Sequence, residues 1–177
     1  MHVGYDLAAL VALYTAVAAA LDYRTRKIPN WLTVPAAVLG LIYHLLAPGG
    51  IGPLASLAGL AIGFALLLLP WILGGGGMGD VKLLAALGAW LGPTLILITF
   101  GLATVLAAFA AVTILTASAV SHGFSVTRRR YASVPAGAAA ASSPAPQKKR
   151  RVLPFAVPVA ASTWLVLAWL LLRSMAA

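Results

Sequence analysis

The sequence predicts an all-α membrane protein with six transmembrane helices and with both termini outside the cytosol. Two observations predict this class. Of the 177 residues, 62% are hydrophobic and only 8% are charged, whereas a soluble domain carries roughly 25% charged residues. The basic residues also gather in clusters between apolar stretches, as they do at the cytosolic ends of membrane helices. The chain contains no cysteine, which excludes disulfides, thiolate catalysis and cysteine-ligated zinc.

Apolar stretches of about 20 residues are long enough to cross a membrane. The longest stretch, 81–120, is too long for one span, and Gly92-Pro93 is its natural break. A helix over 81–91 would be only about 16 Å long. The glycine run before it or the Gly-Pro turn after it must therefore lie at membrane depth, where irregular backbone has to be buried in protein or face a watery cavity. The expected spans are Val3–Leu21, Trp31–Ala47, Leu54–Leu73 with a bend near Pro70, Val81–Leu91, Thr94–Ala119 and Pro154–Leu172.

The basic clusters determine the predicted orientation. Six spans with both termini outside place every cluster on the cytosolic side and leave only Arg173 outside. The net charge is +9, but because the clusters flank apolar spans, we interpret them as topology anchors that contact anionic lipid, not nucleic acid. The chain, 1–177, is expected to form one membrane domain with a flexible cytosolic loop at about 121–153, which is rich in Ala, Ser and Pro.

Acidic residues are scarce: the chain contains only Asp6, Asp22 and Asp80. The topology places Asp22 and Asp80 at the cytosolic face, and Asp6 at the outer face as a solvated end residue. Two carboxylates are the minimum for aspartyl hydrolysis, in which one takes a proton from water and the other, protonated, polarises the carbonyl. Our hypothesis is that Asp80, at a helix N-terminus, is the ionised partner, and that Asp22, near a helix C-terminus, is the protonated one.

Both aspartates also have a purely structural interpretation. Asp80 could cap the helix that follows it, and Asp22 could be a surface acid that pairs with Arg26 four residues later. Under this interpretation the protein is a non-enzymatic membrane scaffold or a small transporter subunit. No cofactor or metal is expected, because the three histidines lack ligand spacing and are interpreted as interfacial residues: His2, His44 and His122.

Four blocks of sequence resemble those of the type IV prepilin peptidases, a family of membrane aspartic peptidases with a GxGD signature. Gly77-Met78-Gly79-Asp80-Val81-Lys82-Leu83 resembles that signature. The block from Asp22 to Ile28-Pro29-Asn30 is similar to the family's first aspartate block. Residues 86–92 resemble the helix after the signature, and residues 153–158 resemble the start of the last helix. The blocks occur in the family's order and spacing, and the resemblance covers nearly the whole chain.

The resemblance implies an aspartic endopeptidase of the plasma or inner membrane, with its active site facing the cytosol. It implies removal of the short basic leader from type IV pilin-like precursors, without a cofactor or metal. Asp22 and Asp80 carry over as the catalytic pair, and Gly77 and Gly79 as the backbone that brings Asp80 to its partner. Lys82 is expected to support the site by reaching the interface and tuning Asp80, although it could equally be a topology anchor.

The chain also departs from parts of the family pattern. Larger members carry an N-terminal cytosolic domain, often with paired cysteines, that is associated with methylation of the new N-terminus. This chain shows neither and resembles the short, peptidase-only type of tight-adherence (Flp) pili, so methylation is not implied. Presenilin and signal peptide peptidase, the other GxGD proteases, use Tyr-Asp and Pro-Ala-Leu. Tyr5-Asp6 supplies the dipeptide at the outer face, but Pro-Ala-Leu is absent.

Overall fold

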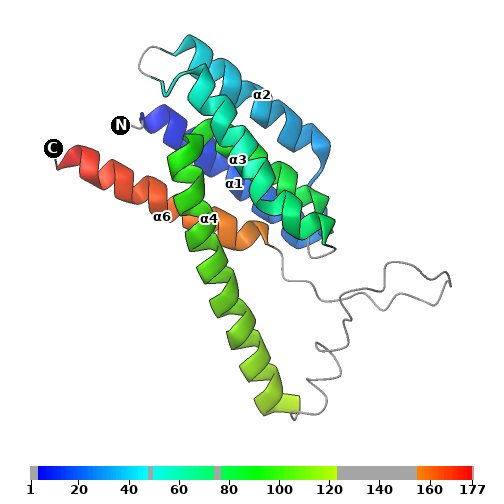
Figure 1. The fold of residues 1–177 in the computed structure, drawn as a ribbon. Helices are drawn as coiled ribbons and strands as arrows, with labels where there is room; N and C mark the ends of the chain where they lie inside the picture. The colour runs from blue at the N-terminus through cyan, green and yellow to red at the C-terminus, as the bar shows by residue number, and fades with distance from the viewer. Residues whose placement is uncertain (1–3, 48–49, 74–76, 123–154, 177) are drawn as a thin grey trace. The chain divides into compact units, whose positions relative to one another are not determined.

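The computed structural model describes residues 4–47, 50–73, 77–122 and 155–176. These residues are helical nearly throughout and contain no strand, which confirms the all-α prediction for the described part (Figure 1). The helices are α1 (Tyr5–Thr25), α2 (Asn30–Leu46), α3 (Pro53–Ile72), α4 (Met78–His122) and α6 (Ala156–Met175).

The described residues divide into two compact units. The first contains the residues up to Thr104 together with 155–176, and the second contains residues 105–122 of α4. The expected loop at about 121–153 lies outside the described residues, apart from 121 and 122, which belong to α4. The organisation as one membrane domain with a cytosolic loop stays a prediction.

Four of the described helices are long and apolar enough to cross a membrane: α1, α3, residues 78–117 of α4, and α6. Helix α2 is apolar but shorter, at 17 residues. The helices therefore fit a polytopic membrane protein, while the six spans and the outside location of both termini stay predictions. The sequence predicts that the first span ends at Leu21, but α1 continues to Thr25, so Asp22 lies within the helix.

Helix α4 is interrupted at Gly92, as the Gly92-Pro93 pair predicts. Gly92 has φ 76° and ψ 178°, between two stretches of regular helix. A positive φ of this size favours glycine, and a Cβ at this position would lie only 2.7 Å from Ile51 Cδ1. Gly92 is buried. The irregular backbone is thus enclosed by protein, as a break at membrane depth requires.

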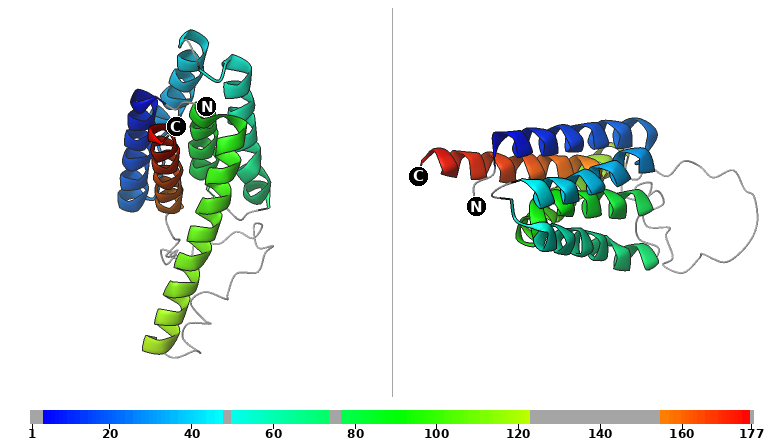
Figure 2. Two further views of the ribbon diagram at one scale, coloured as in Figure 1. Left: turned by 90° about the vertical axis from the view of Figure 1, so that its left-hand side faces the viewer. Right: turned by 90° about the horizontal axis from the view of Figure 1, so that it is seen from above.

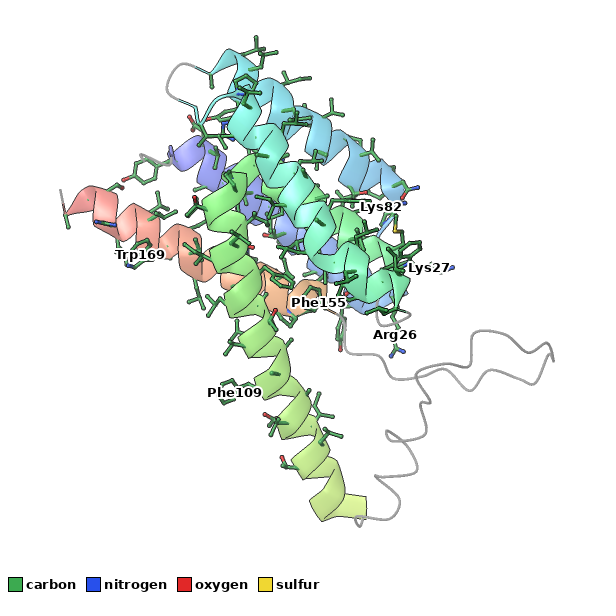
Figure 3. All side chains as sticks on the ribbon, in the orientation of Figure 1. Arg26, Lys27, Lys82, Phe109, Phe155 and Trp169 are labelled. Atoms are coloured by element: carbon green, nitrogen blue, oxygen red, sulfur yellow. The ribbon has the colours of Figure 1, made fainter. Side chains whose placement is uncertain are left out.

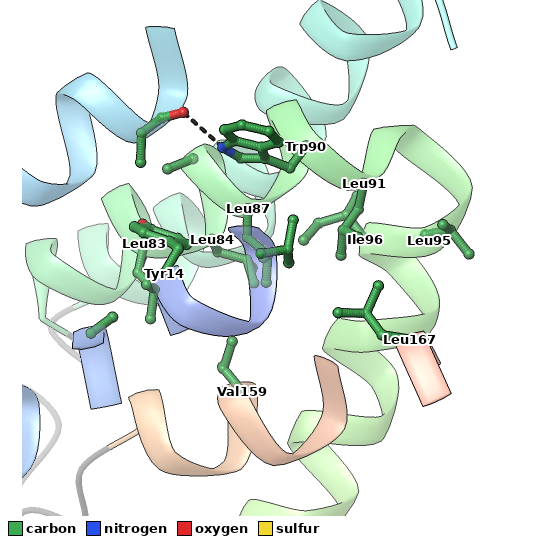
Figure 4. Packing of buried hydrophobic residues seen from close by; sticks show 14 of the residues in the cluster. Tyr14, Leu83, Leu84, Leu87, Trp90, Leu91, Leu95, Ile96, Val159 and Leu167 are labelled. Atoms are coloured by element: carbon green, nitrogen blue, oxygen red, sulfur yellow. Dashed lines mark hydrogen bonds between the residues drawn. The ribbon is translucent and has the colours of Figure 1, made fainter. Parts of the chain in front are cut away.

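The segment of α4 before this break, residues 78–91, is the centre of the first unit, and we call it the central half-helix. Every residue from Leu83 to Leu91 is buried, because a helix that is apolar on all sides has to be surrounded by other elements. Figure 4 shows Leu83, Leu84 and Leu87 near Tyr14 of α1, in a core that also contains Val159 of α6. Helices α1 and α6 lie side by side (Figures 1 and 2).

Glycines bring α3 into close contact with the central half-helix. A Cβ added at Gly59 would overlap the carbonyl oxygen of Gly88, and one added at Gly63 would overlap that of Leu84. Small residues four apart allow two helix backbones to approach this closely in a membrane, where dispersion contacts drive helix association. The backbone contact therefore depends on the absence of side chains at these positions.

The break at Gly92 leaves backbone carbonyls of the central half-helix without partners inside the helix, since Pro93 has no N–H. Side chains from α2 and α3 replace those partners. Ser56 Oγ donates to the Ala89 carbonyl at 2.6 Å, and His44 Nε2 bonds to the Trp90 carbonyl at 2.9 Å. His44, interpreted from sequence as interfacial, is in fact only 4% exposed and satisfies the helix end.

Candidate active site

Asp22 lies in the last turn of α1 and is only 7% exposed. Tyr14, Ala18 and Asp22 follow one another at intervals of four residues, so they share the buried face of the helix. The backbone N–H of Ala156, at the start of α6, donates to Asp22 Oδ2 at 3.2 Å. Arg26, four residues later, interacts electrostatically with Asp22. The burial of Asp22 nevertheless shows that it is not a surface acid.

A tight turn follows α1. Arg26 ends the helix in a left-handed conformation, with φ 53°, and its N–H donates to the Asp22 carbonyl at 2.8 Å. The Lys27 N–H donates to Thr25 Oγ1 at 3.3 Å. These local bonds fix a tight turn, and the turn brings Ile28 into the core, where it is 8% exposed.

Asp80 lies in the first turn of α4 and is half-buried. Its backbone N–H donates to the Gly77 carbonyl at 3.1 Å, and its carboxylate accepts the backbone N–H of Gly77. This is the return bond of a capping box, so Asp80 does help to cap its helix. The carboxyl groups of Asp22 and Asp80 are also close enough to interact electrostatically. Asp80 therefore belongs both to a helix cap and to a pair of acids.

Two contacts join the sequence blocks that contain the aspartates. A Cβ added at Gly79 would lie 3.3 Å from Ile28 Cβ and 3.4 Å from Ile28 N, so the backbone of the glycine motif packs on the turn after α1. Lys82 Nζ donates to Asn30 Oδ1 at 2.8 Å. Figure 3 shows Arg26, Lys27 and Lys82 at one end of the first unit, with Trp169 toward the opposite end.

Asp6, the third acid, is far from this pair. It lies in the first turn of α1 and is exposed. At 1.5 Å per residue it is about 24 Å along the helix from Asp22. Tyr5-Asp6 therefore cannot supply a partner for Asp80 in this arrangement. His44 is committed to a backbone carbonyl, and no group of histidines and acids that could hold a metal occurs in the described ranges.

The hypothesis about the proton depended on which helix end faces each carboxylate. Asp80 lies at the N-terminus of α4, as predicted. Asp22 lies near the C-terminus of α1 but also accepts a bond from the N-terminus of α6. Both carboxylates are thus next to a helix N-terminus, and the helix-end argument no longer separates them. The assignment of the proton to Asp22 stays a hypothesis.

Sequence reasoning missed two residues at this site, Asn30 and Ala156. Asn30 stands in the Ile-Pro-Asn sequence, so its block was identified, but no local pattern pairs it with a lysine on another helix. Ala156 acts through its backbone N–H, which every residue except proline has. Its only sequence signal is its position at the start of the last helix.

An engineered disulfide tests the packing of the two blocks. In the double variant Ile28→Cys/Gly79→Cys, the Cβ atoms would be 3.3 Å apart, close to the range of about 3.5–4.5 Å found in disulfides. We expect this pair to cross-link on mild oxidation, with no competing thiol because the natural chain has none. Reducing and non-reducing electrophoresis measures the product. Asp6→Cys/Gly79→Cys is the matched control, and equal cross-linking of both pairs would contradict the packing.

Comparison with known proteins adds an independent observation. Residues 9–112, more than half of the chain, match the type IV leader peptidase family. A prepilin leader peptidase/N-methyltransferase of Neisseria gonorrhoeae is 41% identical over 83 residues, which cover 41% of this chain and 27% of the Neisseria protein. No solved structure matches the chain. The matched family segment contains both Asp22 and Asp80.

Proposed function

Because this chain belongs to the type IV leader peptidase family, we propose that it is a membrane aspartic endopeptidase that removes the leader peptide from a type IV pilin-like precursor. The observation that supports this proposal best is the meeting of two distant sequence blocks, each with one aspartate, at one end of the first unit. Asp22 is buried, Asp80 is half-buried, and their carboxyl groups are close enough to interact electrostatically. Buried acids that interact with each other are typical of functional sites.

In the proposed mechanism, Asp22 and Asp80 hold the attacking water between them. The ionised carboxylate removes a proton from the water, and the protonated carboxyl donates a hydrogen bond to the carbonyl oxygen of the scissile peptide. When the tetrahedral intermediate collapses, a proton passes to the leaving amine and the peptide bond breaks. Gly77 positions the Asp80 carboxylate through its N–H, and Gly79 allows the backbone to reach Ile28.

We place the site at the cytosolic face of the inner membrane. Figure 3 shows Arg26, Lys27 and Lys82 at one end of the first unit. These residues are close in sequence to Asp22 or Asp80, and basic residues favour the cytosolic side. The same residues are proposed to contact anionic lipid. Because the matched segment spans only 27% of the Neisseria relative, the methyl transfer in that protein's name is not proposed for this chain.

Co-expression with a pilin-like precursor tests the proposed activity. We expect the precursor to lose its leader, with the new N-terminus directly before its hydrophobic helix, as measured by immunoblot and N-terminal sequencing. The alternative, a membrane scaffold or small transporter subunit, is favoured by the capping bond between Asp80 and Gly77. Full-length precursors in cells that contain the folded, membrane-inserted protein would support that alternative.

A further inference from the structure

The hydrogen bond between Lys82 and Asn30 links the two aspartate blocks through side chains. Lys82 Nζ donates to Asn30 Oδ1 at 2.8 Å, joining the second turn of α4 to the first residue of α2. Extending the proposed function, we propose that Asn30 and Lys82 are positioning residues, which hold Asp22 and Asp80 at the separation needed for catalysis. We call this bond the clamp.

The two residues of the clamp lie close in sequence to the two aspartates. Lys82 follows Asp80 by two residues in the same helix, so a displacement of one moves the other. On the other side, only a short turn separates α1, which contains Asp22, from Asn30, and it begins with the bond from the Arg26 N–H to the Asp22 carbonyl at 2.8 Å. The chain that connects Asp22 to Asp80 otherwise runs through α2 and α3. The separation of the two aspartates therefore depends on the packing of α1 against the central half-helix and on the contacts between the blocks, not on the long path along the chain.

The second contact between the blocks, that of Gly79 with Ile28, cannot by itself fix the separation of the two aspartates. Gly79 meets Ile28 through van der Waals contact, which is not directional and tolerates sliding. A hydrogen bond prefers a short distance and a near-linear geometry, so the clamp defines where along the turn the glycine motif sits. We infer that Gly79 allows the close approach and that the clamp sets its register.

If Lys82 acted only through its positive charge, different mutational effects would be expected. If Lys82 only tuned Asp80 or anchored the topology, its positive charge would matter and Asn30 would not, because Asn30 is uncharged. If Lys82 acts through the clamp, removing the acceptor on Asn30 has the same effect as removing the donor. Asn30 is exposed, so its side chain can be changed without opening a cavity.

Lys82→Met and Asn30→Leu are the decisive variants. We expect each to lower kcat for precursor cleavage by about 10- to 100-fold, since a shift of about 1 Å in a catalytic group costs this much. KM and the unfolding midpoint should change little. The double variant should be no worse than the worse single variant, because both remove the same bond. Asn30→Asp, which keeps the acceptor, should retain most of the activity.

A second readout does not require peptidase activity. In the Ile28→Cys/Gly79→Cys background, Lys82→Met and Asn30→Leu should slow disulfide formation, whereas Asn30→Asp should not. Loss of activity in Lys82→Met with wild-type activity and cross-linking in Asn30→Leu would overturn the clamp in favour of charge. If no variant, including wild type, cleaves any precursor, the proposed function fails, and the cross-linking rates alone decide whether the clamp exists.

Discussion

Asp22→Asn and Asp80→Asn are each expected to abolish precursor cleavage. An amide can neither take up the proton of the attacking water nor donate a carboxylic proton to the scissile carbonyl. General acid and base catalysis contributes about 10²–10⁴-fold for each group, so single variants should fall by at least this factor. The double variant should be about as inactive as either single one, because groups that act as a unit are not additive.

Asparagine is the informative replacement because it preserves the bonds that position each side chain. The amide oxygen introduced by Asp22→Asn can accept the Ala156 N–H, so we expect the contact with α6 to persist. The amide oxygen introduced by Asp80→Asn can likewise accept the Gly77 N–H. Both variants should therefore insert, fold and form the engineered cross-link, which separates lost chemistry from lost structure.

Asp6→Asn is the matched control for the catalytic variants. It makes the same chemical change on the same helix, at an exposed position about 24 Å from Asp22. Its cleavage rate should equal that of the wild type. The assay follows conversion of precursor to mature pilin over time, at equal membrane levels of each variant. Cleavage at the wild-type rate by either catalytic variant would rule out the paired-aspartate mechanism.

The sequence predicts those parts of the structure that depend on local chemistry. Hydropathy predicts where the long apolar helices lie, because any stretch that crosses a bilayer has to be apolar. Gly92-Pro93 gives the break in α4, since proline removes a donor and glycine accepts the positive φ. The expectation that Asp22 and Asp80 meet follows from topology and from the resemblance of their blocks to one family, not from either acid alone.

The contacts that the sequence does not predict join residues far apart in the chain. The bond from Ala156 to Asp22 and the clamp each depend on how separate helices pack. The role of His44 depends on the broken helix end of α4, which becomes a hydrogen-bond acceptor only because Gly92 interrupts the helix. A histidine on an apolar helix gives no local sign of such a partner.

Gly88→Ala is expected to destabilise the protein, although alanine normally stabilises a helix. A Cβ at Gly88 would overlap the carbonyl oxygen of Gly59 on α3, and backbone atoms cannot move aside as a flexible side chain can. The helices would have to separate, and overpacking of this kind costs about 1–3 kcal/mol. Denaturant titration of the purified protein in detergent or bicelles would measure the loss.

Gly101→Ala, in the same helix, is expected to stabilise the protein. No atom lies within 4 Å of a Cβ added at Gly101, so the change should raise the free energy of unfolding by about 0.5–1 kcal/mol through helix propensity alone. Because the central half-helix begins with the Asp80 turn, separating it from α3 should also slow cleavage and the engineered cross-link in Gly88→Ala. Equal stabilisation by both alanines would mean that α3 does not approach α4 at Gly88.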